Sequence, residues 1–467
     1  MPFRRRETLA LTGAFLAGLA GCAGDEPRAE TTATSETTDR PDPTDTTTEP
    51  TGFDDFEAPA FPDPDFATDP DLDEDLLADQ LRGNVAFGLD LLRVLGDREG
   101  GNVFASPYSV SVALAMTYAG ARGTTREEMA GALDFELDGE RLHAAFAALE
   151  AEFARRNEDG TDAAVRTATG EADGEDAGPA FELTAANSAW GQEGFPFGEA
   201  FLDLLDAYYG AGLRLADFTG DPEAARERIN GWVADRTNDR IEDLLPRGSI
   251  DTATRLVLTN AVYFSARWAM PFSEDETEPR PFTALDGSTA DVPTMRQELK
   301  TRYAEIEGHQ LVELDYANGD TSMVVVLPAE GAFEAFESSL TVDRLAIMVE
   351  QASRAQVTLS LPKFEFETGV SLVETLRELG MDEAFTPRAD LSGMSDDRDL
   401  FVDDVFHQSF VSVDERGTEA AAATAAVIAE TALSDRVEMT VDRPFLFYIR
   451  DKPTETPLFV GRVTEIE

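Results

Sequence analysis

Cysteine, lysine and histidine are scarce in this chain of 467 residues. Cys22 is the only cysteine, so no disulfide can form within one chain, and a zinc site built on several cysteines is excluded. The only lysines are Lys300, Lys363 and Lys452. The apolar run from Leu9 to Ala20 is too short to cross a bilayer as a helix.

Positive charge of any kind is also scarce. The chain has 92 acidic and 38 basic residues, which gives a formal net charge of −54 at pH 7. Such a charge opposes binding to nucleic acid and to anionic membrane surfaces. It also makes the folded chain repel itself, unless salt at about 1 M shortens the Debye length to about 3 Å. We therefore expect a halophilic protein exported into brine, with an acidic protein from an ordinary medium as the alternative.

The N-terminus, residues 1–22, resembles an export signal. Arg5-Arg6-Glu7-Thr8-Leu9 resembles a twin-arginine signal. Leu19-Ala20-Gly21-Cys22 resembles a lipobox, in which cleavage precedes a cysteine that becomes lipidated. We expect Cys22 to anchor the protein to the outer face of the cell membrane; a signal peptide with an incidental cysteine is the alternative. Residues 23–71 are rich in Thr, Asp, Glu and Pro, which predicts a disordered acidic tether.

The rest of the chain, residues 72–467, alternates helical and strand patterns without a βαβ rhythm, which predicts one α+β domain. Residues 156–180 are Gly, Asp, Glu, Ala and Thr, which predicts a disordered acidic insertion. Apolar spacing predicts helices over 72–95, 107–118, 140–155, 198–210, 222–245 and 369–379. Strands are predicted over 181–190, 256–264, 357–363 and 405–413, and within 282–328.

Motifs of catalysis are missing. The three histidines are His143, His309 and His407, and the chain has no HExxH, P-loop or GxSxG pattern. Ser360-Leu-Pro-Lys363 matches the SxxK of β-lactamase-like enzymes, but it lies in a strand pattern with a proline and no KTG partner follows. We expect no enzymatic activity, no cofactor and no metal site.

The most informative stretch is the run of small residues from Glu415 to Ala429. Alanine runs favour helix, but the strand patterns on both flanks do not. As a strand, the run would present only small or apolar side chains and threonines on one face, namely Thr418, Ala420, Ala422, Thr424, Ala426 and Ile428. The segment can therefore stay exposed as a loop or enter a sheet as a strand.

That dual character resembles the hinge and reactive-centre loop of the serpins, inhibitors that insert this loop into their own β-sheet. Four further motifs resemble serpin motifs and occur in family order over residues 75–467. They are Asn102-Val-Phe-Ala-Ser106-Pro107-Tyr-Ser109, Leu258 to Phe272, Asp442 to Ile449 and Pro457 to Val463. The resemblance implies the serpin fold, with a large mixed central β-sheet, two smaller sheets, about eight to nine helices and an exposed loop within 415–440.

The resemblance also implies roles for polar residues. Ser106, Ser109, Asn260 and His407 match a cluster beneath the opening of the main sheet, and we name this set the latch. Buried polar groups must be paired or cost about 1–3 kcal/mol each, so the latch would hold the sheet closed. Lys363 and Trp268 match the top of the sheet, which we name the breach, where Lys363 would pair with Glu415; a surface pair of little energetic consequence is the alternative.

The hinge consists of Glu415, Gly417, Thr418, Glu419, Ala420, Ala421, Ala422, Ala423 and Thr424. Gly417 would permit the chain to reverse there. From Thr418 to Thr424 there is no proline to block ladder hydrogen bonds, and Glu419, the one charge, falls on the outward face. Loop insertion is therefore expected to be possible.

The family's usual hinge length places the reactive-site bond at Thr431–Ala432, with positions from Glu430 to Ser434 left open. A small residue at the bond and Ile428 three positions upstream suit elastase-like or subtilisin-like proteases, and no Arg or Lys lies between Thr418 and Asp435. The expected partner is an extracellular serine protease, trapped covalently by a monomer. A non-inhibitory surface binding protein and an inhibitor of cysteine proteases are the alternatives. A heparin-like partner is not expected, because the matching region is acidic.

The charge balance gives a first testable prediction. The stability of the chain against urea should rise steeply with KCl, because screening removes self-repulsion. Unfolding midpoints followed by circular dichroism across a KCl series measure this dependence. Undiminished stability at low salt would contradict the halophilic interpretation.

Overall fold

The computed structural model describes residues 52–61, 64, 66, 72–162, 181–210, 213–396, 400–418 and 436–466. The expectations for the export signal, Cys22 and most of the tether lie outside the described residues. So do those for Glu419, Ala420, Ala421, Ala422, Ala423, Thr424, Thr431 and Ala432. Pro50 to Glu467 form one compact unit.

The central sheet has seven strands in the order β11-β12-β13-β5-β3-β4, with β2 also paired to β5. It is mixed, because β12 runs parallel to β5 while β11 and β13 run antiparallel to β12. The bounds are β2 Phe181–Ala185, β3 Ser188–Gln192, β4 Arg214–Ala216, β5 Leu256–Arg267, β11 Phe364–Ser371, β12 Asp404–Val413 and β13 Gly417–Thr418. The predicted strand 181–190 is therefore two strands.

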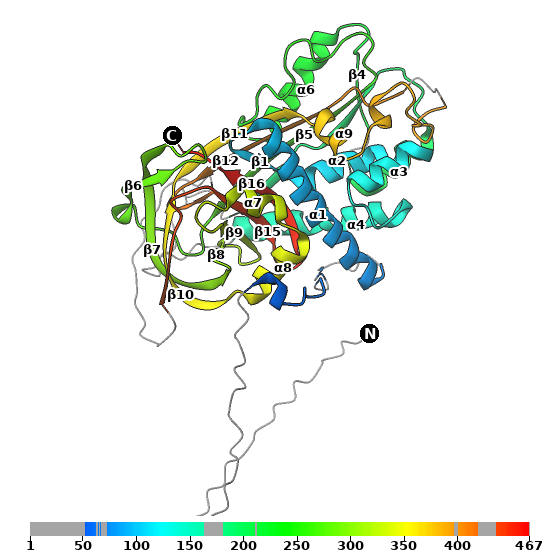
Figure 1. Cartoon of the computed structure of the whole chain (residues 1–467). Helices are drawn as coiled ribbons and strands as arrows, with labels where there is room; N and C mark the ends of the chain where they lie inside the picture. Colours follow the sequence, from blue (N-terminus) through cyan, green and yellow to red (C-terminus); the bar gives the residue numbers. More distant parts are fainter. Residues whose placement is uncertain are drawn as a thin grey trace, which may run out of the picture. The chain divides into compact units, whose positions relative to one another are not determined.

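The two smaller sheets are continuous through the long strand β7, giving nine strands in all (Figure 1). The first part of β7 pairs with β6 and β10, and its last residues, Tyr303 to Ile306, pair with β8. The bounds are β1 Val103–Ala105, β6 Glu278–Thr283, β7 Thr289–Ile306, β8 His309–Asp315, β9 Thr321–Leu327, β10 Ser353–Pro362, β14 Arg436–Thr440, β15 Phe445–Asp451 and β16 Thr456–Val463.

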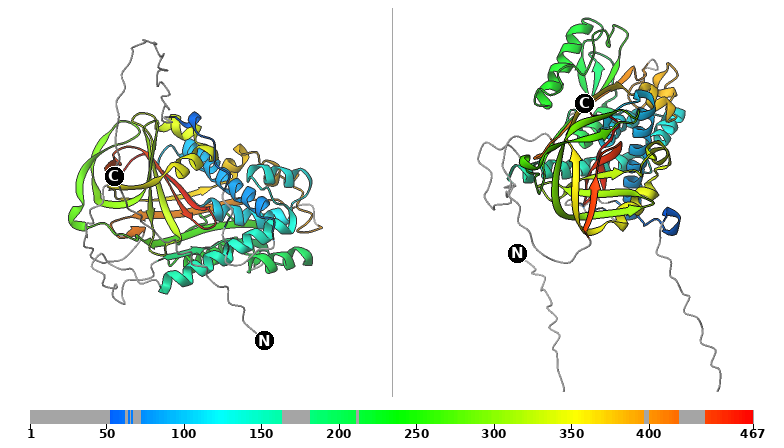
Figure 2. Two further views of the ribbon diagram at one scale, coloured as in Figure 1. Left: turned by 90° about the horizontal axis from the view of Figure 1, so that it is seen from below. Right: turned by 60° about the vertical axis from the view of Figure 1, so that its left-hand side comes forward.

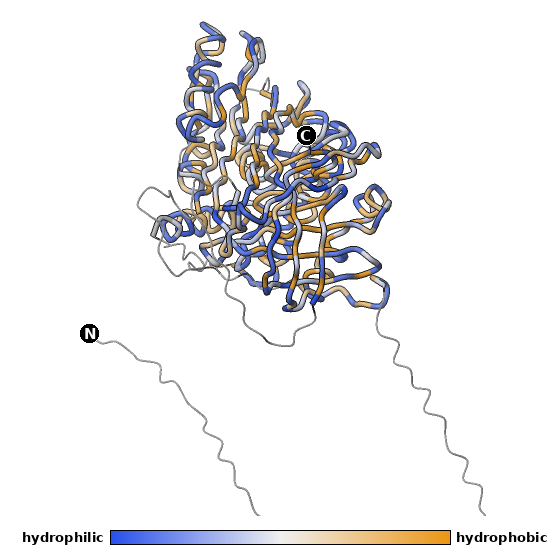
Figure 3. The backbone as a smooth tube through the Cα atoms, turned by 90° about the vertical axis from the view of Figure 1, so that its left-hand side faces the viewer, coloured by the Kyte–Doolittle hydropathy of each residue, from blue (hydrophilic) through white to orange (hydrophobic). Residues whose placement is uncertain are grey.

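Nine α-helices occur in the described residues, so the predicted α+β class is confirmed. They are α1 Glu74–Glu99, α2 Pro107–Gly120, α3 Gly123–Ala132, α4 Gly139–Asp162, α5 Glu199–Tyr209, α6 Pro222–Arg236, α7 Phe333–Ser339, α8 Val342–Gln351 and α9 Val373–Glu378. Short 3₁₀ turns are η1 Phe53–Asp55, η2 Glu274–Glu276 and η3 Glu383–Phe385. Hydrophilic and hydrophobic residues alternate along the outer helices, as amphipathic helices require (Figure 3).

Helix α2 shows how local sequence sets an element that later positions the site. Ser106 is its N-cap, and its hydroxyl accepts a hydrogen bond from the amide of Ser109 at 3.2 Å. Pro107 occupies the first helical position, where its missing N–H costs nothing. The helix is buried almost throughout, so both serines are held inside the fold.

Helix α6 covers a second, smaller hydrophobic core on the central sheet. This core joins α6 to β5 and β12 through Ile229, Val257, Ala261 and Phe406, among others. The right-hand view of Figure 2 shows α6, in green, set apart from the blue and cyan helices. Any strand that enters between β12 and β5 must therefore pass beneath α6.

The predicted helix 222–245 is too long, because α6 ends at Arg236. Asn238 and Asp239 have φ values of 52° and 60°, a left-handed conformation that stops an α-helix. The apolar residues Ile241, Leu244 and Leu245 continue the helical spacing, but they are not helical. They are apolar because they pack into the second hydrophobic core.

The tether predicted over 23–71 is corrected at its C-terminal end. Phe53 is only 4% exposed, with its ring 6.2 Å from that of His309 and the Arg344 guanidinium 4.8 Å above it. Farther along, Pro59, Ala60 and Phe61 line a cavity of about 340 Å³ with residues of α1 and α8. We call residues 52–61 the N-terminal strap. The scattered aromatic residues of this segment could have indicated that it packs on the domain. The acidic composition nevertheless favoured the prediction of disorder.

Replacing Phe53 by alanine should loosen the strap. Burying a Phe side chain contributes about 1.5–3 kcal/mol, so limited proteolysis within residues 52–61 should accelerate about tenfold or more. Mass spectrometry of the early fragments measures this rate. Asp54→Ala, at an exposed neighbouring position, is the matched control. Equal cleavage rates for the two variants would contradict the docking of the strap.

Candidate functional site

The first residues of the hinge already lie inside the central sheet. Gly417 and Thr418 form β13, which pairs with Val413 of β12 and with Ala266 and Arg267 of β5. Below this point β12 and β5 pair directly, from Asp404 opposite Val257 to Ser409 opposite Val262. We call Gly417 and Thr418 the wedge, because they lie between β12 and β5. We call the directly paired residues of β12 and β5 below them the seam.

Gly417 has a different role from the predicted chain reversal. A Cβ atom at this position would lie 2.0 Å from the backbone oxygen of Ala266 and 2.7 Å from the Cα of Arg267. Gly417 is not among the described residues with positive φ. It is needed because the hinge approaches the backbone of β5 closely. The turn itself is made by Asp414, whose carboxylate accepts the amides of Arg416 at 2.8 Å and Gly417 at 3.2 Å.

The breach holds Glu415 in a buried position, where this residue is 6% exposed. Its carboxylate accepts hydrogen bonds from Lys363 Nζ at 2.8 Å and from the Thr277 hydroxyl at 2.7 Å. Burial alone would raise the pKa of Glu415, but these bonds hold it below its ordinary value. The ion pair keeps Glu415 charged and fixed at the start of the hinge.

Trp268 binds the turn before the wedge through the backbone. Its indole Nε1 donates to the carbonyl of Asp414 at 3.0 Å, and its amide donates to that of Arg416 at 2.8 Å. Its ring stacks on Tyr316 at 4.7 Å. The Tyr316 hydroxyl in turn lies 2.8 Å from that of Thr418, which is 1% exposed. Tyr316 and Thr277 were not predicted, because no motif marks them.

The latch residues come together across the seam beneath the wedge. His407 of β12 lies directly opposite Asn260 of β5, and its Nδ1 bonds Asn260 Oδ1. His407 Nε2 accepts the amide of Ser106 at 3.4 Å, which places the proton on Nδ1. The Asn260 amide donates to the Ser109 hydroxyl at 2.7 Å. Opening the seam must break the His407–Asn260 bond.

Asn187, at the break between β2 and β3, completes the latch and was not predicted. Its Oδ1 accepts hydrogen bonds from Asn260 Nδ2 at 2.9 Å and from the Ser109 hydroxyl at 2.5 Å. Asn187 lies outside the four segments that resemble serpin motifs, so only its place in the sheet reveals it. Burial lowers the pKa of His407 to about 4. The latch histidine is therefore neutral near pH 7.

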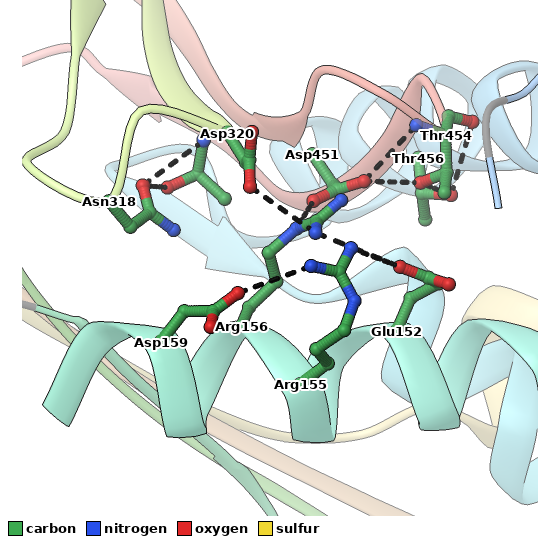
Figure 4. Close-up of polar contacts among 10 residues, drawn as sticks. Glu152, Arg155, Arg156, Asp159, Asn318, Asp320, Asp451, Thr454 and Thr456 are labelled. Carbon is green, nitrogen blue, oxygen red and sulfur yellow. Dashed lines mark hydrogen bonds and ion pairs between the residues drawn. The ribbon is translucent and has the colours of Figure 1, made fainter. Parts of the chain in front are cut away.

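The predicted insertion 156–180 is wrong at its start, because α4 continues to Asp162. Arg156 is 1% exposed, and its guanidinium lies 3.0 Å from Asp451 and 3.2 Å from Asp320 (Figure 4). Its neighbour Arg155 pairs with Glu152 at 2.7 Å. The partners of Arg156 come from the β8–β9 turn and the end of β15, so the composition of the segment could not show that the helix continues.

The far side of the predicted loop 415–440 is also corrected. Arg436 to Thr440 form β14, which pairs in parallel with β10 from Gln356 to Ser360. Val437 and Met439 alternate with charged residues, a strand pattern that the interpretation as a loop overlooked. The described part of the chain thus leaves only residues 419–435 between the wedge and β14.

Metal clusters and membrane-spanning helices can be looked for only in the described residues. Within them, no three or more His, Cys, Asp or Glu side chains gather where a metal ion could bind. No helix among them is long and apolar enough to cross a membrane. His143 is buried against Tyr209, with its Nδ1 2.7 Å from that hydroxyl.

The geometry matches a known class. The model of the family described as "Serpin (serine protease inhibitor)" matches residues 82–466. Leukocyte elastase inhibitor of Bos taurus is 37% identical over 82% of this chain and 98% of that protein. Antithrombin-III of Mus musculus is 34% identical over 82% of this chain and 80% of that protein. The chain belongs to the serpin family, which is described by serine protease inhibition and whose members are generally not enzymes.

The fold agrees with this assignment. The native-state structure of the thermophilic serpin tengpin covers 89% of this chain and 99% of its own length, with 29% identity and a TM-score of 0.72. The predicted serpin fold, with a large central sheet and smaller sheets, is therefore confirmed.

The latch gives a testable pH dependence. The imidazole of His407 should remain neutral until about pH 4, whereas an unfolded histidine titrates near 6.5. As the pH falls, protons therefore bind this histidine in the unfolded chain first. The contribution of His407 to the free energy of unfolding is full above about pH 6.5 and falls by about 1.4 kcal/mol per pH unit toward pH 4. NMR titration of the three imidazoles measures this, with His407→Gln assigning the signal. A His407 signal that titrates near pH 6.5 would contradict the buried, neutral state.

Proposed function

We propose that this serpin inhibits extracellular serine proteases of the subtilisin-like or elastase-like kind by covalent trapping. The observation that supports this most is the wedge: Gly417 and Thr418 already pair with β12 and β5 at the top of the seam. The hinge residues that follow lack proline and, apart from Glu419, are small. Continued pairing would build a strand that bonds to a neighbour on both sides.

The chemistry belongs to the protease. Its serine oxygen attacks the carbonyl of Thr431, the bond to Ala432 breaks, and the amine of Ala432 leaves with a proton, so that an ester joins the two proteins. Insertion of the cut loop then carries the tethered protease away before water completes the hydrolysis. The native fold must for this reason be metastable and held by a kinetic barrier.

The breach and the latch supply that barrier. Insertion must part the pairs from Asp404–Val257 to Ser409–Val262, including the bond between His407 and Asn260. The Lys363–Glu415 pair and Trp268 hold the start of the hinge in place until the loop is cut. Cleavage frees the other end of the loop, so that the gain from new strand pairing can exceed the cost of parting the seam.

The target class rests on the sequence around the reactive-site bond. Thr431 is small and Ile428 is apolar, as elastase-like and subtilisin-like pockets require, and one relative is named for inhibition of leukocyte elastase. Adjacent bonds between Glu430 and Ser434 are the competing positions. A non-inhibitory binding protein and a cysteine protease inhibitor remain the alternative functions.

The setting of the protein belongs to the same proposal. The segments that resemble an export signal and a lipobox support lipid anchoring through Cys22 to the outer face of the cell membrane, and the charge of −54 supports a saline medium. The inhibitor is proposed to act as a monomer. Sulfated polysaccharide is not expected to bind the end of α4, since Arg155 and Arg156 are already paired with carboxylates there.

The full chain incubated with a subtilisin-type and an elastase-type protease tests the mechanism. A band at the summed mass on a denaturing gel, with a released peptide that starts at Ala432, is the expected result. Thr418→Arg should abolish the adduct and yield cleaved chain, because a charge would replace a buried side chain within the sheet. Mass spectrometry of both products identifies the cut.

Thr289→Arg places the same charge at an exposed position of β7 and should trap as well as the unchanged protein. Trapping by the Thr418→Arg variant at the level of this control would refute insertion. Clean cleavage of the unchanged chain by both proteases without an adduct would favour the non-inhibitory alternative.

A further inference from the structure

Three arginines gather around two tryptophans at the junction of β4 and α6. The Arg214 guanidinium lies 4.5 Å from the ring centre of Trp232 and 5.8 Å from that of Trp190. Arg236 lies 5.4 Å from the Trp232 ring, and Arg228 lies 5.9 Å from the Trp190 ring. The two indoles meet edge to face at 5.5 Å. We call Arg214, Arg228 and Arg236 the arginine cluster.

The positions follow from local structure. Arg228, Trp232 and Arg236 are spaced four residues apart on α6 and therefore share one face of the helix. Arg214 begins β4, the edge strand of the central sheet beside α6 (Figure 1). The cluster thus spans the contact between α6 and the sheet beneath it.

The cluster lacks counter-ions in a chain that has a large excess of them. Among the described residues, none of the three arginines has a carboxylate within the 4 Å of an ion pair. The buried arginines Arg156, Arg226, Arg450 and Arg462 each have one. Nearby carboxylates bind elsewhere: Asp217 accepts the Gly220 amide, and Glu223 pairs with Arg226.

The arginine cluster without a bound anion is also energetically unfavourable. Burial, then the charges of Arg236 and Arg228, lower the pKa of the Arg214 guanidinium. The Nε of Arg214 is buried and has no hydrogen-bond partner in the described part of the chain. Stacking on tryptophan contributes about 0.5–2 kcal/mol per contact. Of the three arginines, only Arg228 has a hydrogen bond among the described residues, from Nη1 to the carbonyl of Leu215 at 3.0 Å. The guanidinium N–H groups of Arg214 and Arg236 are therefore left for a ligand. Arg228 and Arg236 are exposed, so a solute can reach the cluster.

We propose that the arginine cluster is a binding site for a compact multivalent oxyanion, of the phosphate or sulfate type, that ties α6 to β4. Guanidinium groups bind such oxygens through two parallel hydrogen bonds. A small anion fits better than a long polyanion, because the strongly negative surface of the protein repels an extended chain of like charge.

The site has a consequence for loop insertion, and this part rests on the proposed inhibitory function. Helix α6 covers Phe406 of β12 together with Val257 and Ala261 of β5. A bound anion that joins Arg214 to Arg228 and Arg236 would hold α6 on the sheet. It would slow entry of the cut loop, so that more inhibitor would be cleaved for each protease trapped.

Pyrophosphate and inorganic sulfate, titrated into the full chain against KCl of equal ionic strength, test the site. Trp190 and Trp232 are two of only three tryptophans, so their fluorescence should change saturably with pyrophosphate. Arg228→Gln and Arg236→Gln, at exposed positions, should each weaken binding about tenfold. Arg354→Gln, at an exposed position in β10, is the matched control and should bind as the unchanged chain does.

Several results would overturn the proposal. A fluorescence change no larger than that produced by KCl, or equal affinity in the cluster variants and the control, would show that the arginines serve only to pack α6. A sulfated oligosaccharide that binds more tightly than pyrophosphate would contradict the compact ligand. Binding is measured without protease, so it stands or falls independently of inhibition. The ratio of cleaved to trapped inhibitor, with and without pyrophosphate, then tests the effect on insertion.

Discussion

The direct pairing of β12 with β5 is the constraint on which the rest of this structure depends. These parallel strands are joined below the wedge and parted above it, where Gly417 and Thr418 lie between them. In the proposed mechanism, the bonds of the seam oppose the entry of the rest of the hinge below this point. Each feature around the seam either closes it, covers it or restrains the hinge that would open it.

Polar groups close the seam where apolar packing would not be reversible. The hydrogen bond between His407 and Asn260 crosses between the two strands, and Ser109 and Asn187 satisfy the remaining polar atoms of Asn260. Leaving such groups unpaired in the interior is costly. A hydrogen-bonded contact of this kind holds one arrangement firmly, and under the proposed mechanism its groups would pair with other partners after a strand has entered.

Arginines lie where helices α4 and α6 meet the rest of the fold, although positive charge is scarce in this chain. Arg156 joins the end of α4 to Asp320 and Asp451, whereas the arginine cluster at α6 and β4 has no carboxylate partner among the described residues. Because basic residues are few, this difference suggests that paired and unpaired arginines have different roles. Paired arginines hold elements together permanently, and an unpaired cluster can do so conditionally, when an anion is present.

The sequence by itself determined the α+β class and the helices with clear apolar spacing, and its motifs pointed to Ser106, Ser109, Asn260 and His407 of the latch and to Lys363 and Trp268 of the breach. These follow from local periodicity, from capping as at Ser106, and from motifs that stay together along the chain. The resemblance to serpins identified His407 and Asn260 as members of the latch. It did not show that these two residues lie directly opposite each other across the seam.

Only the tertiary structure decided where several elements end and what completes the site. The N-terminal strap is held in place because Phe53 packs against His309 and Arg344. Helix α4 continues to Asp162, and Arg156 within it pairs with the carboxylates of Asp320 and Asp451 far along the chain. Asn187, Tyr316 and Thr277 join the site through contacts that no spacing in the sequence reveals. Gly417 is required by the nearby backbone of β5. In each case the physical reason is the same: local sequence sets conformational preference, while a residue's partner across the fold sets its environment.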